Sequence, residues 1–368
     1  MSQRESIPWA MPSFWGNEQA YVQEALRSTW ISGGPFVDRF ERDFAGYHGA
    51  RHALTSSNGT TALHMAFLAF GIGPGDEVIV PGFGFLAAAN VAIHLGATPV
   101  FAEVDPLTWC VGAPGIERCL SLRTKLIVAV HTYGNVCDMR GILDLALGRG
   151  IPVVEDAAEA LASRDHGRLA GTMGSIGAFS FQATKTVTTG EGGMVLTDDE
   201  GLAESMALYR SHGMQRRVHY WHDVPGYNFR LTNLQAALGV AQLEKLATIV
   251  AARDQVRRTY AERLAIIDGV LPQQFASAVE PVVWTVGVKL DAEAYPQGRD
   301  HVIAQMTELG VETRPGFYPP SHMRHIYDCP PLPVCEEISR QVISLPTYAS
   351  LDGERIARIC STLSGLRR

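Results

Sequence analysis

Six short apolar runs between residues 77 and 197 alternate with segments of helical periodicity, and this alternation restricts the fold more than any other feature. A chain that alternates strands and helices in this way forms a mostly parallel sheet with helices on both faces. We therefore predict an α/β fold. The predicted strands cover residues 77–80, 98–103, 126–131, 152–155, 177–181 and 194–197.

The pattern changes near residue 245, where a long charged segment with helical character begins. Strand signals follow at 282–290 and around 311–313. We predict a large α/β domain over residues 1–245 and a smaller α+β C-terminal domain over residues 246–368. A chain of 368 residues is long enough to bury the core that two such domains need.

Composition excludes several classes of function. A net charge of −7 argues against nucleic-acid binding. The six cysteines show neither Cys-x-x-Cys pairing nor histidines at zinc spacing, so we expect reduced thiols and no metal. The first eight residues lack the apolar core of a signal peptide, and the longest near-apolar stretch, 78–93, is too short for a membrane span. We expect a cytoplasmic protein.

The candidate for chemistry is Lys185, in a polar turn between an apolar run at 176–181 and Gly190-Glu-Gly-Gly193. Burial beside apolar strands disfavours an ammonium group and lowers the pKa of a lysine. A neutral amine at this place could form a Schiff base with an aldehyde. The alternative is a surface lysine in a loop.

Two further segments bear on that choice. Asp156 ends an apolar run that we predict to continue into a helix, and its carboxylate could hold the pyridine nitrogen of pyridoxal phosphate (PLP) protonated. A helix N-cap is the alternative. The turn Ser57-Asn-Gly-Thr60 opens a helix, where free backbone N–H groups suit a phosphate. The alternative is that these residues only cap the helix.

Several motifs together resemble the DegT/DnrJ/EryC1/StrS family of PLP-dependent sugar aminotransferases over nearly the whole chain. They include Ser-Asn-Gly-Thr-Thr-Ala62, Glu-Asp-Ala-Ala-Glu159, Ser-Phe-Gln-Ala-Thr-Lys185, Gly-Glu-Gly-Gly193 and Gly-Tyr-Asn-Phe-Arg-Leu-Thr232. The resemblance implies aminotransferase fold type I, with a mostly parallel seven-stranded sheet in the large domain.

The resemblance also assigns the cofactor site. It implies that Lys185 carries PLP and moves protons, and that Asp156 keeps the pyridine nitrogen charged. Asn228 would reach the cofactor of a neighbouring subunit, which implies a homodimer with shared active sites. The cofactor-binding residues implied are Ser57, Asn58, Gly59, Thr60, Phe85, Asp156, Glu159, Ser180, Lys185 and Asn228.

The reaction implied is transamination of a nucleotide-linked 4-keto-6-deoxyhexose with L-glutamate, for deoxysugar biosynthesis such as that of lipopolysaccharide O-antigen. Family members acting on GDP-4-keto-6-deoxymannose are the most similar. Arg216 and Arg217 suit a diphosphate and Tyr220 could stack on a base, although the same loop could be solvated or contact a subunit. The substrate-binding residues expected are Trp30, Ser32, Arg216, Arg217, Tyr220, Arg314, Tyr318 and His322.

Other readings stay open. Gln182-Ala-Thr184 departs from the Phe-Gly-Asn of the members that act on GDP-linked sugars, so amination at C3, or of a dTDP- or UDP-linked sugar, is an alternative. Gly82-x-Gly-x-x-Ala87 with Glu103 about twenty residues later fits an NAD-binding oxidoreductase. A non-catalytic PLP-binding regulator is a third alternative. We interpret His131 as a satisfied, partly buried histidine.

Overall fold

The computed structural model describes residues 6–215, 218 and 220–368. Within these residues, seven strands form one sheet in the order β1-β9-β8-β5-β4-β2-β3. The segment from β8 to β3 is parallel throughout, and β9 runs antiparallel to both neighbours. The predicted mostly parallel sheet is therefore confirmed. Its strands are β1 (His52–Ser56), β2 (Glu77–Pro81), β3 (Thr98–Ala102), β4 (Thr124–Val130), β5 (Val153–Asp156), β8 (Ile176–Ser180) and β9 (Gly193–Thr197).

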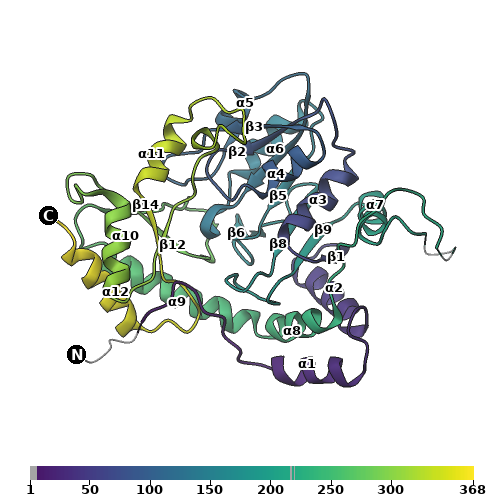
Figure 1. Ribbon diagram of the computed structural model, residues 1–368, viewed down its shortest axis with the longest axis horizontal. Coiled ribbons are helices and arrows are strands. Elements are labelled where there is room, and N and C mark those ends of the chain that lie inside the picture. Colours follow the sequence, from purple (N-terminus) through teal and green to yellow (C-terminus); the bar gives the residue numbers. More distant parts are fainter. Residues whose placement is uncertain (1–5, 216–217, 219) are drawn as a thin grey trace.

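Helices surround this sheet (Figure 1). The helix α3 (Gly59–Ala69) packs against β8 and β9, because its Leu63, Ala66 and Phe67 form a continuous buried surface. The remaining elements of this part are α1 (Glu18–Arg27), α2 (Pro35–His48), α4 (Ala87–His94), α5 (Ala113–Glu117), η1 (Thr132–Gly134), α6 (Met139–Leu147), α7 (Glu200–Arg210) and α8 (Asn233–Glu244).

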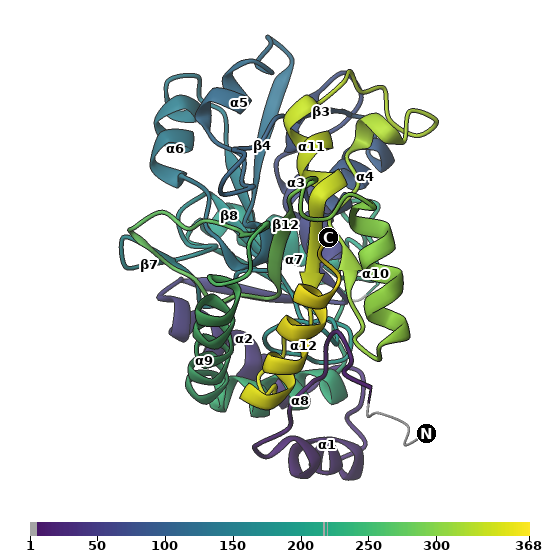
Figure 2. The same ribbon diagram turned by 90° about the vertical axis from the view of Figure 1, so that its left-hand side faces the viewer.

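Beyond α8, four described strands form a separate antiparallel sheet in the order β10-β12-β14-β13. Figures 1 and 2 show α10 and α12 beside this sheet, on the side away from the seven-stranded sheet. The elements are α9 (Leu246–Leu264), β10 (Val270–Pro272), β12 (Val286–Leu290), α10 (Gly298–Glu308), β13 (Arg314–Pro315), η2 (Pro320–His322), α11 (Pro333–Gln341), β14 (Val342–Leu345) and α12 (Gly353–Gly365).

A third, small sheet links the two parts of the chain. Within the described residues it has three strands, β11 (Val279–Glu280), β6 (Arg164–Asp165) and β7 (Arg168–Leu169). No single described helix is long and apolar enough to cross a membrane. Only α8 and α9 taken together, which meet at a bend of 66°, reach that length and composition, as buried core helices also can.

The two hydrophobic cores interlock. Ile7 lies in the C-terminal core and forms a bridge with Val311, although it stands near the start of the chain. Conversely, Tyr327, Leu332 and Cys335 lie in the core of the large sheet. The segment before α1 therefore packs with the C-terminal part of the chain, and the segment around α11 packs with the large sheet.

The strand predicted over 282–290 is wrong at its start, because β12 begins at Val286. The preceding residues make their hydrogen bonds elsewhere: Val282 N–H donates to Ser163 Oγ, and Trp284 N–H donates to the Tyr133 carbonyl. The strand signal around 311–313 is also displaced, since β13 covers Arg314–Pro315.

The helix predicted after Asp156 is wrong. The Ala157 N–H donates to the Ala178 carbonyl of β8, and the Ala158 N–H donates to Asp156 Oδ1 at 3.1 Å. Both bonds hold the chain in a turn, so Asp156 is not a helix N-cap. The turn instead keeps Glu159 on the same side of the sheet as Asp156, since both line one pocket.

Candidate active site

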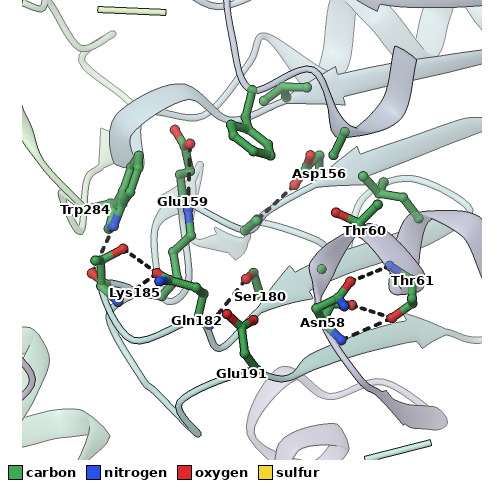
Figure 3. Close-up of a pocket in the computed structure, with 17 residues that line it drawn as sticks. Asn58, Thr60, Thr61, Asp156, Glu159, Ser180, Gln182, Lys185, Glu191 and Trp284 are labelled. Atoms are coloured by element: carbon green, nitrogen blue, oxygen red, sulfur yellow. Dashed lines mark hydrogen bonds and ion pairs between the residues drawn. The ribbon is translucent and has the colours of Figure 1, made fainter. Parts of the chain in front are cut away.

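A pocket of about 670 Å³ lies at the carboxyl ends of β4, β5 and β8, where open α/β sheets bind ligands (Figure 3). Val130, Asp156 and Ser180, from the ends of these strands, line it. The pocket also brings together most of the predicted cofactor-binding residues, namely Asn58, Gly59, Thr60, Phe85, Asp156, Glu159, Ser180 and Lys185.

One end of the pocket is the N-terminus of α3. Asn58 Oδ1 accepts the Thr61 N–H at 2.9 Å, and the Ala62 N–H is the first to bond back along the helix, to the Asn58 carbonyl. This leaves the N–H groups of Gly59 and Thr60 directed out of the helix end, where they and the helix dipole favour an anion. A Cβ on Gly59 would lie 2.8 Å from Ser180 Cβ, so glycine allows the helix to approach β8.

Asp156 lines the pocket from the end of β5. Its side chain is buried, and the backbone N–H of Ala158 donates to it. Burial raises the pKa of Asp156, while the Ala158 N–H and the Lys185 ammonium oppose that shift. A buried carboxylate of this kind favours a cationic partner in the pocket.

Lys185 lies at the other end of the pocket, in a turn closed by its own N–H donating to the Gln182 carbonyl at 2.8 Å. Its Nζ is 3.7 Å from Glu159 Oε1, and its side chain is 13% exposed. Burial lowers the pKa of Lys185, against the opposing charges of Glu159 and Asp156. The predicted alternative of a surface lysine is therefore wrong.

Glu159 is held beside the lysine by the Tyr133 N–H, which donates to Glu159 Oε2 at 2.9 Å. Burial raises the pKa of Glu159 to about 7, and the Lys185 charge and the Tyr133 N–H oppose this. Desolvation thus drives both members of the pair toward their uncharged forms. The lowered pKa of Lys185 makes its neutral amine more accessible than that of an exposed lysine.

Trp284 forms part of the pocket wall and was missed by sequence reasoning. Its ring centroid is 3.6 Å from Lys185 Nζ. It stands in the segment that the strand pattern of 282–290 wrongly assigned to a sheet, and it is about a hundred residues from the lysine. No local signal would have indicated it.

Gln182, Thr184 and Glu191 also line the pocket. Gln182 Oε1 accepts from both the N–H and the hydroxyl of Thr184, at 2.9 and 2.7 Å. Two of the three residues that depart from the family pattern, Gln182 and Thr184, therefore fix one another. The Glu191 carboxylate lies on the same side of the pocket (Figure 3).

Two predicted cofactor-binding residues are not among those that line the pocket. Ser57 Oγ bonds with Thr61 Oγ1 at 3.1 Å, behind the helix end. Asn228 is exposed, and its Oδ1 accepts from Arg230 Nε at 3.1 Å. The Ser57 N–H donates to the Phe229 carbonyl, so the segment carrying Asn228 lies next to the turn that opens α3.

Those predicted substrate-binding residues that the structure describes do not line the pocket of a single chain. Trp30 and Tyr220 are 65% and 77% exposed, and the turn containing Ser32 is held by Asn233, whose N–H donates to the Ser32 carbonyl. Arg216 and Arg217 lie outside the described residues.

Two of the three C-terminal candidates, Arg314 and Tyr318, already have side-chain partners in the protein. Arg314 pairs with Glu312, as the alternative of an ion pair predicted. Tyr318 accepts a hydrogen bond from Arg299 Nη2 at 3.2 Å, and His322 is exposed at the end of η2. Their roles in substrate binding stay predictions.

The glycine pattern at Gly82 serves packing, so the NAD-binding alternative is wrong. A Cβ on Gly82 would lie 2.5 Å from Leu332 Cδ1, because α11 covers this turn. Glu103, which would have to bind a ribose, accepts instead from the N–H groups of Val334 and Cys335, both at 3.0 Å. These bonds satisfy the N-terminus of α11 and hold the two parts of the chain together.

The interpretation of His131 as a histidine with satisfied ring nitrogens is confirmed, although its side chain is fully rather than partly buried. Its Nε2 is 2.9 Å from Glu155 Oε2, and its Nδ1 accepts the Cys137 N–H at 3.2 Å. Glu155 also accepts from the Gly171 N–H. Through Glu155, these bonds connect the end of β4 to the loop that precedes β8.

The pocket fits PLP on three observations. The end of α3 with Ser180 suits the phosphate, Asp156 is a buried carboxylate that would hold the pyridine nitrogen, and the Lys185 amine is directed into the same space. Phe85, which is 64% exposed, lines the pocket and would supply an aromatic wall for the ring.

Comparison with known proteins agrees with this geometry. The model of the DegT/DnrJ/EryC1/StrS aminotransferase family matches residues 13–364. GDP-perosamine synthase of Caulobacter vibrioides is 42% identical over 99% of both chains, and that of Vibrio cholerae is 36% identical over 97% of this chain and 98% of its own. The crystal structure of the aminotransferase TlmJ from Streptoalloteichus hindustanus has a TM-score of 0.93 at 30% identity, over 98% of each chain.

Proposed function

Since the chain belongs to the DegT/DnrJ/EryC1/StrS aminotransferase family, we propose that it transfers an amino group from L-glutamate to C4 of a GDP-linked 4-keto-6-deoxyhexose. Membership makes it a PLP-dependent sugar aminotransferase. The choice of substrate is supported by relatives named GDP-perosamine synthase, which are 36% to 42% identical over nearly the full chain. The arrangement that carries the proposal is Lys185 and Asp156 in one pocket with the N-terminus of α3.

When bound, PLP supplies a carbonyl carbon that takes up amines and a ring that accepts electrons. The residues of the chain would bind and orient the cofactor. Gly59, Thr60 and Ser180 would bind the phosphate. Asp156 would hold the ring nitrogen protonated, and Phe85 would cover the ring on one face.

Lys185 Nζ is the group that moves protons. Its lowered pKa makes the neutral amine accessible, so Nζ can take a proton from the amino donor and later return it. Glu159 faces Nζ. An ionised Glu159 balances the ammonium form of Lys185, and a protonated Glu159 leaves no unpaired charge beside the neutral amine. This is the arrangement that a ping-pong transamination needs, because the same lysine serves both half-reactions.

We also propose a homodimer in which Asn228 completes the site of the partner. Asn228 is exposed in the single chain, yet it lies next to the turn at Ser57. Large apolar side chains are exposed on α1 and just beyond it, at Leu26, Trp30 and Ile31. A second copy of the chain would cover such side chains.

The test is a panel of GDP-, dTDP- and UDP-linked 4-keto-6-deoxyhexoses, each incubated with the PLP-loaded chain and L-glutamate. We expect mass spectrometry to find an amino sugar with the GDP-linked substrate, together with 2-oxoglutarate. Nuclear magnetic resonance of the product should place nitrogen at C4. Lys185→Ala is the inactive control, and a product from only the dTDP- or UDP-linked sugars would refute the proposed substrate.

A further inference from the structure

The ring of Trp284 covers the amine of Lys185. Nζ lies 3.6 Å from the ring centroid and 3.7 Å from Glu159 Oε1. Figure 3 shows these three side chains together at one end of the pocket, with the phosphate-binding turn at the other. The lysine nitrogen is thus held between an aromatic face and a carboxylate.

The orientation of the ring is fixed by contacts from distant parts of the chain. Its indole N–H donates to the Thr184 carbonyl at 2.9 Å, one residue before the lysine. The Trp284 backbone N–H donates to Tyr133, and its carbonyl accepts from Arg253 Nη1 at 3.2 Å. Trp9 packs edge-on against the ring at 5.4 Å. A ring held in this way presents one face to Nζ.

The charged groups around Nζ are Glu159 and Asp156, which follow or end β5, and Arg253 of α9. The two carboxylates favour the ammonium form of Lys185, whereas burial and Arg253 disfavour it. An aromatic face attracts a cation through its quadrupole. Trp284 therefore acts on the ammonium form in the same direction as the carboxylates, without adding a further charge to the pocket.

We propose that Trp284 is a positioning residue that holds the ammonium group of Lys185 against Glu159 whenever the amine is free. In this role, which rests on the proposed transamination, the ring keeps Nζ in place while it carries a proton between the two half-reactions. The indole N–H bond to Thr184 ties the ring to the turn that carries the lysine. The ring and the lysine therefore keep a fixed separation.

In the cofactor-free chain, the direction in which the pKa of Lys185 changes distinguishes two roles of the ring. If the ring stabilises the cation, removing it lowers the pKa of Lys185. If the ring is only an apolar wall, removing it admits water and leaves that pKa unchanged or raises it, because hydration favours the ammonium. The direction of the change separates the two roles.

The measurement is competitive labelling with acetic anhydride between pH 6 and pH 11, with mass spectrometry of the peptide that contains Lys185. The chain has four lysines, so Lys245 and Lys289 serve as internal references. We expect the pKa of Lys185 to fall by about 0.5 to 1 in Trp284→Leu, and by less in Trp284→Phe, which keeps a weaker aromatic face. Trp15→Leu, at an exposed position, is the matched control and should match the wild type.

An unchanged or raised pKa of Lys185 in Trp284→Leu would overturn the proposal. Circular dichroism verifies the fold of each variant. Should Trp284→Leu fail to fold, Trp284→Phe provides the test. A pKa of Lys185 below that of the wild type supports the proposal, and an equal or higher pKa refutes it.

A second readout uses the PLP-loaded protein. We expect the maximal rate of the L-glutamate half-reaction to fall about two- to fivefold in Trp284→Phe, with the half-saturating glutamate concentration unchanged. A change confined to that concentration would contradict a positioning role. If the wild type fails to react with L-glutamate, the proposed function fails, while the labelling result still decides whether the ring holds the cation.

Discussion

Lys185 Nζ and Glu159 Oε1 lie 3.7 Å apart, and burial drives both groups toward their uncharged forms. Burial raises the pKa of Glu159 to about 7 and lowers the pKa of Lys185, so the pair is less charged here than the same two groups would be in water. The pocket thereby supplies an amine that can act as a base without leaving an unpaired charge in a buried site.

The first prediction concerns where the cofactor attaches. Borohydride reduction of the PLP-loaded protein should attach a pyridoxyl group to Lys185, because this amine is buried, has a lowered pKa and lines the pocket. Peptide mapping by mass spectrometry measures it. Lys125, which is exposed, is the internal comparison. Label on any other lysine would show that the site is assigned wrongly.

The second prediction concerns Asp156. Replacement of Asp156 by Ala should lower kcat by about 100- to 1,000-fold, because a preorganised charge beside the reacting centre is lost. Asp156→Asn should lose a similar factor, since an amide keeps the shape but not the charge. Circular dichroism and cofactor content serve as controls. Near-native kcat in Asp156→Asn with normal PLP content would rule out an electrostatic role.

The third prediction concerns stability against pH. Glu159 holds its proton in the folded state up to about pH 7, whereas a glutamic acid in the unfolded chain loses it near pH 4.5. The folded state therefore binds more protons in this window, and its stability falls as pH rises from about 4.5 to 7. The loss should be about 3 kcal/mol at most.

Glu159→Gln should remove that fall, because glutamine resembles the protonated acid at every pH. Urea unfolding of the cofactor-free chain at pH 5 and pH 7.5 gives the comparison. Glu262→Gln, on an exposed part of α9, is the matched control and should keep the slope of the wild type. Equal slopes in the wild type and Glu159→Gln would contradict a raised pKa.

The fourth prediction concerns the diphosphate. Arg216→Ala or Arg217→Ala should raise the KM for the nucleotide sugar about tenfold or more, since a hydrogen bond to a charged group contributes about 1.5–3 kcal/mol. The L-glutamate half-reaction should be unchanged, because glutamate carries no diphosphate. Arg263→Ala, on α9, is the control. Equal losses in both half-reactions would show that the loop has a structural role.

The fifth prediction concerns shared sites. Lys185→Ala and Asn228→Ala chains should each be inactive alone, yet mixing them should restore part of the activity. In a mixed dimer, one site receives both an intact lysine and an intact asparagine from the partner. Native mass spectrometry verifies that subunits exchange. Exchange without any recovery of activity would mean that Asn228 does not complete a partner's site.

Sequence patterns predicted the parallel core of the large sheet because β2, β3, β4, β5 and β8 are largely apolar runs with clear boundaries. They did not predict β1, whose sequence His-Ala-Leu-Thr-Ser mixes polar and apolar residues. It is stabilised by pairing with β9, a strand about 140 residues later, so its environment depends on a contact that local pattern does not contain.

The same distinction applies to the site. Asp156, Lys185 and the turn at Gly59 each carry a local signature, and the structure places them in one pocket. The ring of Trp284 and the use of Glu103 at α11 depend on how the C-terminal part packs against the large sheet. Neither residue stands in a pattern that specifies its partner.

Glu103 fixes α11 from the large sheet, while Trp284 reaches Lys185 from a segment beyond α9. A chimera that took its C-terminal portion from a relative, to change which sugar is accepted, would therefore also replace the ring over the reactive amine. Substrate preference and the basicity of the lysine would then change in one exchange. Recombination within this fold is safest when residues 103, 284 and 332–335 are inherited together.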